Sequence, residues 1–271
     1  MHRSGAKRAM RFCTWMMIVA IGLVTVACGS ARKKEPKAPP LRVAVAVDYP
    51  PIIFKQGEMV TGVEADLARA MGEALGRRVE FVQVKRAKLV TELLRGGADI
   101  IMSGLSQTRA RGLRVAFTQP YHGNALLGLC RVADVGRFDT TEKILASTAA
   151  IGAPRGTTSD AWVEANCKNA RLVRVGTPDG GAFELLRRRI DCFIYDAHAI
   201  GWLVSENEAQ LAPTSLEPLA EEKLAWAVRL NDAELLGAVD DVLARWKSDG
   251  TLEQILRRWL PYYDVSRAWG D

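Results

Sequence analysis

Buried-strand runs alternate with amphipathic helical segments from residue 41 onward, and this alternation restricts the chain to an α/β fold. Apolar strand-like runs cover residues 41–47, 79–84 and 99–102. Between the first two, apolar side chains recur at helical spacing until Gly76, a typical helix stop. Because strands joined through helices pair in parallel and need cover on both faces, this order predicts a mostly parallel sheet between helices.

The same alternation continues through the second half of the chain. Strand-like runs follow at residues 125–131, 149–153, 171–175, 190–195 and 223–228. Two helices close the pattern, and capping boxes predict that they begin at Asn231–Glu234 and Thr251–Gln254. The part after residue 40 is long enough for one large domain or for two smaller lobes, and periodicity alone leaves both arrangements open.

The first 40 residues predict export rather than folding. Four basic residues precede an apolar run at residues 15–27, which is typical of a secretory signal and too short for an ordinary membrane-spanning helix. Residues 28–40 are polar, basic and rich in proline, so we expect an extended tether without a core of its own.

The basic net charge of the chain comes from this N-terminal part. The chain has 37 basic and 31 acidic residues. Without the eight basic residues and one acidic residue of the signal and tether, 29 basic and 30 acidic residues remain. A near-neutral body argues against nucleic acid as a partner.

Cysteine and histidine usage gives no sign of a metal site, because the sequence has no CxxC motif and only three histidines. Cys130 and Cys192 lie in apolar runs, which favours buried free thiols. A disulfide between Cys167 and Cys192 remains an open alternative.

The stretch from Ser103 to Tyr121 carries the clearest binding signal. A strand runs into Ser103-Gly104-Leu105-Ser106, and Arg111 follows soon after. Gly104 lets the backbone approach a ligand, Ser106 offers a hydroxyl, and Arg111 supplies a planar fork that matches a carboxylate. The pattern predicts a carboxylate receptor at a strand end, where α/β sheets hold ligands. The alternative is a polar loop in which Thr108 caps a helix and Arg111 points into solvent.

This stretch resembles the bacterial extracellular solute-binding proteins of family 3, the amino-acid-binding proteins of ABC importers. The matching residues are Asp99, Gly104, Ser106, Thr108, Arg111, Phe117, Thr118 and Tyr121. The resemblance implies a two-lobe periplasmic-binding-protein fold (type II) with two hinge crossovers. Lobe 1 would be residues 41–124 plus 226–271, and lobe 2 would be residues 125–225.

The end of the apolar run at residues 25–28 resembles a bacterial lipobox, so residues 1–27 would form a lipoprotein signal peptide. Cleavage before Cys28 would leave that thiol to carry a lipid. The protein would then be outside the cytoplasm, anchored to a bacterial membrane. An ordinary secretory peptide cut near Ala27 is the alternative, with Cys28 incidental.

The family resemblance also assigns ligand contacts beyond Arg111. Tyr49 matches an aromatic residue that packs over the ligand side chain, and Thr157 and Thr158 match a loop that faces the carboxylate from the second lobe. Asp196 matches the aspartate that takes the ligand ammonium. Two of these residues have a structural alternative: loop packing for Tyr49, and a helix cap for Asp196.

Two positions depart from the family pattern around the ligand side chain. Ala46 stands where an acid is frequent, and Arg86 stands where a second aromatic residue is expected. Arg86 could favour an acidic ligand side chain, or it could be a solvated residue at a helix start. Glu64 and Asp66 are assigned to the start of a helix, where acids interact favourably with the helix dipole, and not to the ligand.

The resulting hypothesis is a solute-binding protein that closes on an amino acid or a similar small zwitterion and delivers it to an ABC permease. We expect a monomer with no cofactor, no metal and no catalytic residue. A periplasmic enzyme resembling cyclohexadienyl dehydratases is one alternative, and a ligand-sensing module on the same fold is another.

Overall fold

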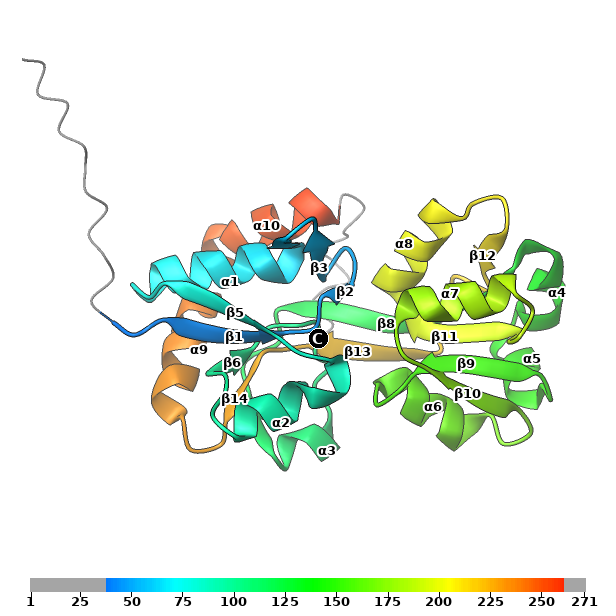
Figure 1. Ribbon diagram of the computed structural model, residues 1–271, viewed down its shortest axis with the longest axis horizontal. Helices are drawn as coiled ribbons and strands as arrows, with labels where there is room; N and C mark the ends of the chain where they lie inside the picture. The colour runs from blue at the N-terminus through cyan, green and yellow to red at the C-terminus, as the bar shows by residue number, and fades with distance from the viewer. Residues whose placement is uncertain (1–37, 261–271) are drawn as a thin grey trace, which may run out of the picture. The chain divides into compact units, whose positions relative to one another are not determined.

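The computed structural model describes residues 38–260, and a five-stranded sheet in the order β5-β1-β6-β14-β7 combines strands from the start of these residues with one strand near their end (Figure 1). The strands are β1 (Leu41–Val45), β5 (Val79–Gln83), β6 (Ile100–Ile101), β7 (Val115–Phe117) and β14 (Ala227–Arg229). A small antiparallel sheet follows β1 and contains β2 (Asp48–Tyr49), β3 (Ile53–Gln56) and β4 (Met59–Thr61).

The middle of the chain builds a second, six-stranded sheet. Its main order is β10-β9-β11-β8-β12, and β13 also pairs with the long strand β8. The strands are β8 (His122–Arg131), β9 (Ala150–Pro154), β10 (Arg171–Val175), β11 (Cys192–Asp196), β12 (Leu211–Pro213) and β13 (Ala220–Leu224).

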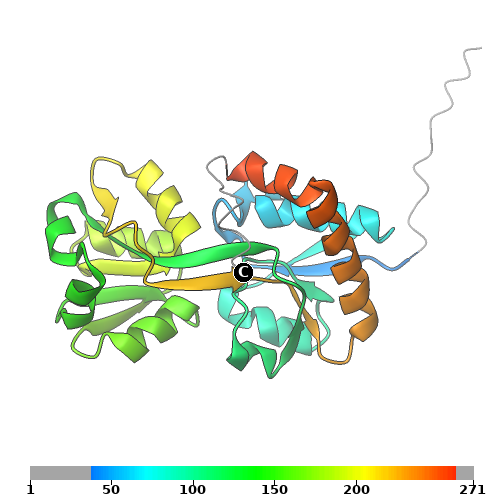
Figure 2. The same ribbon diagram turned by 180° about the vertical axis from the view of Figure 1, so that it is seen from behind.

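Helices cover both faces of the two sheets (Figures 1 and 2). The first sheet is flanked by α1 (Val63–Ala74), α2 (Leu89–Leu94), α3 (Arg109–Gly112), α9 (Ala233–Asp249), α10 (Thr251–Trp259) and the 3-10 turn Arg86–Lys88. The second is flanked by α4 (Val135–Phe138), α5 (Thr141–Ala146), α6 (Thr158–Asn166), α7 (Pro178–Leu186), α8 (Ala197–Glu206) and the 3-10 turn Val132–Asp134.

Alternating side chains of β1 explain why helices are needed on both faces. Val43 and Val45 belong to the core that includes α1, α9 and α10, whereas Ala44 packs with α2 on the opposite face. Successive side chains of a strand point to opposite faces, so an apolar strand such as β1 is buried on both. The strand pattern of the sequence is therefore confirmed at the level of packing.

Two connections join the sheets: the segment between β7 and β8, and the segment between β13 and β14 (Figure 2). They lie side by side, because Thr118 N donates to Trp226 O at 3.0 Å and Tyr121 N donates to Leu224 O at 2.9 Å. The chain leaves the first sheet once and returns once. We propose that residues 125–225, between the two crossovers, form the second lobe.

Both sheets are mostly parallel, as expected, and each contains one strand that runs against the others. β1 pairs in parallel with β5 and β6, but β14 is antiparallel to β6 and β7. In the second sheet, β8 is antiparallel to β11, β12 and β13. These two strands, β14 and β8, are the ones through which the chain enters each sheet from the other.

The predicted strand at residues 223–228 is two strands, β13 and β14. At the break, Ala225 N donates to Leu105 O at 3.1 Å instead of to a strand neighbour. The predicted capping boxes are also wrong. Asp232 caps α9 by accepting a hydrogen bond from Leu235 N, and Gly250, at φ +82°, begins α10 without a side-chain cap.

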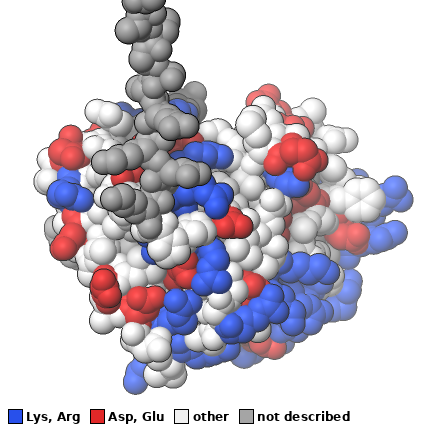
Figure 3. All heavy atoms as spheres, turned by 60° about the vertical axis from the view of Figure 1, so that its left-hand side comes forward, with Lys and Arg blue, Asp and Glu red and all other residues white. Residues whose placement is uncertain are grey.

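The three cysteines within residues 38–260 are free and buried in one apolar cluster, which confirms the expected thiols and leaves Cys167 and Cys192 unpaired. Acidic and basic side chains are interspersed over much of the face in Figure 3, although Lys and Arg gather toward its lower right. None of the helices between residues 38 and 260 has the length and hydropathy to cross a bilayer. The expected signal peptide, Cys28 and most of the expected tether lie outside the described residues.

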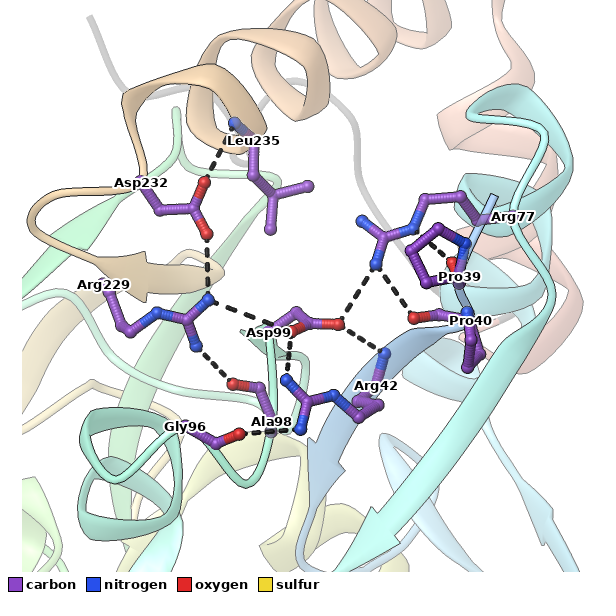
Figure 4. Close-up of polar contacts among 10 residues, drawn as sticks. All are labelled: Pro39, Pro40, Arg42, Arg77, Gly96, Ala98, Asp99, Arg229, Asp232 and Leu235. Carbon is purple, nitrogen blue, oxygen red and sulfur yellow. Dashed lines mark hydrogen bonds and ion pairs between the residues drawn. The ribbon is translucent and has the colours of Figure 1, made fainter. Parts of the chain in front are cut away.

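An arginine cluster surrounds Asp99 at the N-terminal end of β6 (Figure 4). Asp99 accepts hydrogen bonds from the Arg42 side chain at 2.6 Å and from Arg77 at 3.1 Å, while Arg229 lies 3.8 Å away. These contacts hold the pKa of Asp99 below its usual range despite its partial burial. Arg77 also donates to the carbonyls of Pro39 and Pro40, so the cluster holds the residues directly before β1 in place.

Asp99→Ala should lower the free energy of unfolding by about 1–3 kcal/mol, because it leaves several half-buried arginines without their shared acceptor. Solvent reaches those arginines, so the loss should be smaller than for a fully buried pair. Urea unfolding measures the change. Asp139→Ala, which removes an exposed pair with Lys143, is the matched control and should change little. Unchanged stability in Asp99→Ala would show that the cluster does not stabilise the fold.

Candidate functional site

A cavity of about 230 Å³ lies between the two sheets, at the C-terminal ends of parallel strands. Seven of the eight residues predicted to bind ligand line it, which brings together positions from distant parts of the sequence. These residues are Arg86, Gly104, Ser106 and Arg111 from the first part of the chain, and Thr157, Thr158 and Asp196 from the middle part. Tyr49 is not among the lining residues.

The loop after β6 is held by hydrogen bonds on several sides. Gly104 has φ +59°, and a Cβ atom there would come within 2.6 Å of the Tyr49 ring, so only glycine fits. Its N–H donates to Glu64 Oε1 at 2.7 Å, so this amide already has a partner within the protein. The Ser106 hydroxyl donates to Glu222 Oε2 at 2.6 Å. The loop is thus positioned by acids that the sequence analysis did not assign to the site.

Arg111 reaches the cavity rather than bulk solvent. Its Nη1 donates to Ser106 O at 2.7 Å, and burial lowers its pKa. Thr108 does cap α3, because its hydroxyl oxygen accepts from Arg111 N at 3.2 Å. The two interpretations of this segment are therefore compatible: the threonine caps the helix while the arginine side chain lines the cavity.

On the opposite wall, the Gly156–Thr158 loop begins α6. Thr157 is the N-cap, and its hydroxyl donates to Pro154 O at 2.7 Å and accepts from Asp160 N at 3.2 Å. Gly156 N donates to Asp160 Oδ2 at 2.9 Å. The Thr157 hydroxyl and the Gly156 amide therefore already have local partners, although Gly156, Thr157 and Thr158 all line the cavity.

Asp196, at the end of β11, is only 4% exposed. It occupies the N-cap position of α8, yet its side chain accepts no capping hydrogen bond from that helix. Burial and the nearby Glu222 carboxylate raise its pKa to about 7. The helix-cap alternative is thus wrong, and Asp196 is a buried acid whose charged form a cationic ligand would stabilise.

Arg86 is a paired residue, which excludes the solvated alternative. Its Nη2 donates to Asp48 Oδ1 at 2.7 Å and its Nη1 donates to Ser103 O at 3.2 Å. The guanidinium lies 5.1 Å from the centre of the fully buried Tyr49 ring. Asp48 offsets the charge of Arg86, which removes the basis for expecting a preference for acidic ligands.

The structure adds three residues to the site that sequence reasoning did not identify. Tyr195 lines the cavity, and its buried hydroxyl has no hydrogen-bond partner among the described residues. Glu222 contacts Ser106, and Glu64 contacts Gly104. The sequence holds a weak sign of Glu64, since it stands between apolar residues that bury one face of α1. Glu222 lies in a charged run and has no such sign.

Comparison with known proteins gives this arrangement a context. The sequence model of the bacterial extracellular solute-binding proteins, family 3, matches residues 41–262. The L-cystine-binding protein TcyJ of Escherichia coli (strain K12) is 25% identical over 221 residues, covering 81% of this chain and 82% of TcyJ. A cyclohexadienyl dehydratase of Pseudomonas aeruginosa is 27% identical, covering 82% of this chain and 83% of the enzyme.

A solved structure shows the same fold. It is an amino acid ABC transporter substrate-binding protein from Streptococcus pneumoniae bound to L-arginine, with a TM-score of 0.73 and 28% identity, covering 81% of this chain and 92% of that one. The predicted two-lobe fold of periplasmic binding proteins is confirmed. Because the family match extends over most of the sequence, the chain belongs to the bacterial extracellular solute-binding proteins, family 3.

Proposed function

We propose that this protein captures one L-α-amino acid between its lobes and delivers it to an ABC permease. The observation that carries the proposal is the pair of opposite charges in one cavity: Arg111 on the wall of the first lobe and Asp196 on the wall of the second. An arginine fork suits a carboxylate, and a buried carboxylate suits an ammonium group. A ligand with both groups would contact both lobes and stabilise their closed arrangement.

The size of the cavity supports a small ligand. About 230 Å³ is less than the roughly 300–1,000 Å³ typical of sites for drug-sized molecules. Relatives in the family bind L-cystine and L-arginine, which carry the same two groups on one carbon. Family membership also supports the permease as partner and a location outside the cytoplasm. We propose that the protein acts as a monomer.

A calorimetric and thermal-shift panel tests the proposal. It should include L-cystine, L-arginine, L-glutamate and L-leucine, each beside its D-enantiomer. At a free concentration 100 times its Kd, the cognate ligand should stabilise the protein by about 2.7 kcal/mol. If no L-amino acid changes the melting temperature or gives a binding isotherm, the proposed function is wrong.

One observation favours a second candidate, a dehydratase that resembles the cyclohexadienyl dehydratases. Asp196 has a pKa of about 7, which suits a general acid, and it lines a cavity on the fold of a relative that is an enzyme. Incubation with prephenate or arogenate, followed by detection of the aromatic product, separates the two functions. A binding protein should show no turnover, and an enzyme should lose it in Asp196→Asn.

We also propose that Cys28 carries a lipid that tethers the protein to the membrane. The support is the lipobox-like sequence at residues 25–28, followed by a polar tether. Labelled palmitate should be incorporated into the full chain in a bacterial host, and Cys28→Ser should abolish the label. Cys130→Ser, which changes a buried thiol, is the control and should retain it. An unlabelled mature protein released from the membrane would contradict the lipid anchor.

A further inference from the structure

Glu64 is a fully buried carboxylate whose bonds reach three separate segments. Its Oε1 accepts from Gly104 N at 2.7 Å and from the Tyr121 hydroxyl at 2.8 Å. Its Oε2 accepts from Trp226 Nε1 at 2.8 Å. All three partners are uncharged donors, so the ionised carboxylate satisfies all of them at once.

The three partners of Glu64 lie in the ligand loop and in the two crossovers between the sheets. Gly104 is in the loop that lines the ligand cavity. Tyr121 lies in the connection that leads to β8, and Trp226 lies in the connection that returns from β13. The Tyr121 and Trp226 rings stack with centroids 5.1 Å apart. One carboxylate therefore joins the ligand loop to both crossovers, the segments that any closure of the lobes must bend.

We propose that Glu64 is a positioning residue that holds the Gly104 loop in its binding geometry and couples that loop to the hinge. The proposal rests on the proposed function of the cavity. Other hydrogen bonds hold the neighbouring residues of the loop, but the Gly104 N–H itself donates to Glu64, so this carboxylate sets the orientation of the left-handed peptide next to Tyr49. Loss of the acceptor should let the loop rotate away from the geometry that aligns Ser106 and Arg111 with a ligand.

The burial of the Glu64 carboxylate supports a role in positioning the loop rather than in stabilising the fold. Burial raises the pKa of Glu64 to about 7, while its three hydrogen bonds and the attraction of Arg86 act in the opposite direction. A buried carboxylate of this kind is costly for folding, and an apolar residue could fill the site at lower cost. Protonation of Glu64 would place a hydrogen on an oxygen that faces only donors. It would therefore weaken the hydrogen bonds that hold the Gly104 loop, Tyr121 and Trp226.

The test compares Glu64→Gln with Asp66→Asn, a matched acid-to-amide change in the same helix turn. Asp66 bonds to Arg258 and Trp259, away from the cavity. Glutamine keeps the shape of Glu64 but turns an amide donor toward donors. Glu64→Gln should weaken an amino acid and its 2-hydroxy analogue equally, by about tenfold, whereas Asp66→Asn should bind as the native chain does.

A pH profile separates positioning from a purely structural role. Tyr121 and Arg86 act directly on Glu64, and Asp196 titrates in the same range, so the profile is measured in an Asp196→Asn background. There, affinity for the 2-hydroxy acid should fall as the pH drops from 8 to 5.5. Adding Glu64→Gln should remove this dependence.

The Trp226 indole gives a direct signature in the empty protein. With ¹⁵N-labelled tryptophan, the Trp226 N–H resonance, identified by its loss in Trp226→Phe, should titrate with a midpoint near pH 7 and should not titrate in Glu64→Gln. If Glu64→Gln does not fold, Tyr121→Phe serves instead. Losing one donor to the carboxylate should raise this midpoint and weaken binding several-fold.

Native affinity with a native pH profile in folded Glu64→Gln would overturn the proposal, as would a Trp226 resonance that does not respond to pH in the native chain. These outcomes are distinct from failure of the proposed function. If the native chain binds no amino acid, the proposed function fails. The Trp226 titration then still tests whether Glu64 bonds to the crossover segments as an ionised carboxylate. A role of Glu64 in ligand binding would be excluded together with the proposed function.

Discussion

Replacing Arg111 with alanine should abolish amino-acid binding and leave the protein folded. The guanidinium lies at the wall of the cavity, where Nη1 donates to Ser106 O at 2.7 Å and Nη2 donates to Gly156 O at 3.5 Å, and its remaining N–H groups can meet a carboxylate. Losing one partner of a buried charge pair costs about 2–5 kcal/mol, which is a loss of roughly 30-fold to several thousand-fold in affinity. Isothermal titration calorimetry measures this change with the ligand found in the amino-acid panel.

Two further variants serve as controls for Arg111→Ala. Arg109→Ala removes an exposed arginine from the same short helix and should bind normally. Arg111→Lys keeps the charge without the planar fork, so its affinity should lie between those of the native chain and Arg111→Ala. A melting curve for each variant checks folding. Native affinity in Arg111→Ala would remove this residue from the site.

Asp196→Asn should weaken binding of the amino acid by about 2–5 kcal/mol and should leave the matching 2-hydroxy acid little changed. The reason is that only the amino acid carries an ammonium group for the buried carboxylate. Asparagine has nearly the same shape, so the comparison isolates charge. Calorimetry with both ligands on both proteins gives the result. An equal loss for both ligands would make Asp196 a structural residue.

The raised pKa of Asp196 also predicts opposite effects of pH on affinity and stability. Burial and Glu222 raise this pKa to about 7, with Arg86 and Arg111 opposing. As pH falls below 7, Asp196 becomes protonated and amino-acid affinity should fall. The folded pKa is above the unfolded value, so its contribution to the stability of the empty protein is present at low pH and lost as pH rises through 7.

Asp196→Asn should reduce both effects, because asparagine does not titrate. Affinity measured from pH 8 to 5.5 should then change less than in the native chain, and the stability of the empty protein should fall less steeply between pH 5 and 8. Glu64 contributes to stability with the same sign, since its pKa is also raised to about 7. The double variant with Glu64→Gln should therefore have the flattest stability profile. An unchanged profile in Asp196→Asn would contradict the buried-acid assignment.

The sequence by itself determined the local elements of this fold. Val43 and Val45 alternate with Ala44, and the helical spacing of apolar residues marks α1, because side-chain burial repeats every two residues in a strand and every 3.6 in a helix. The residue types from Gly104 to Arg111 also indicated a carboxylate site, whereas Asp196 was indicated only by the family resemblance. Such patterns depend on neighbours in the chain and need no tertiary information.

Only the tertiary structure decided which of those residues meet and what they contact. Glu64 bonds to Trp226 across 162 sequence positions, and Ser106 bonds to Glu222 across 116. Asp48 pairs with Arg86 and so offsets a charge that the sequence left unassigned. β8 and β14 run against the other strands of their sheets because the chain enters the second sheet through β8 and returns to the first through β14. A local pattern reports whether a position is buried, but the partner of a buried charge is set by how distant segments pack.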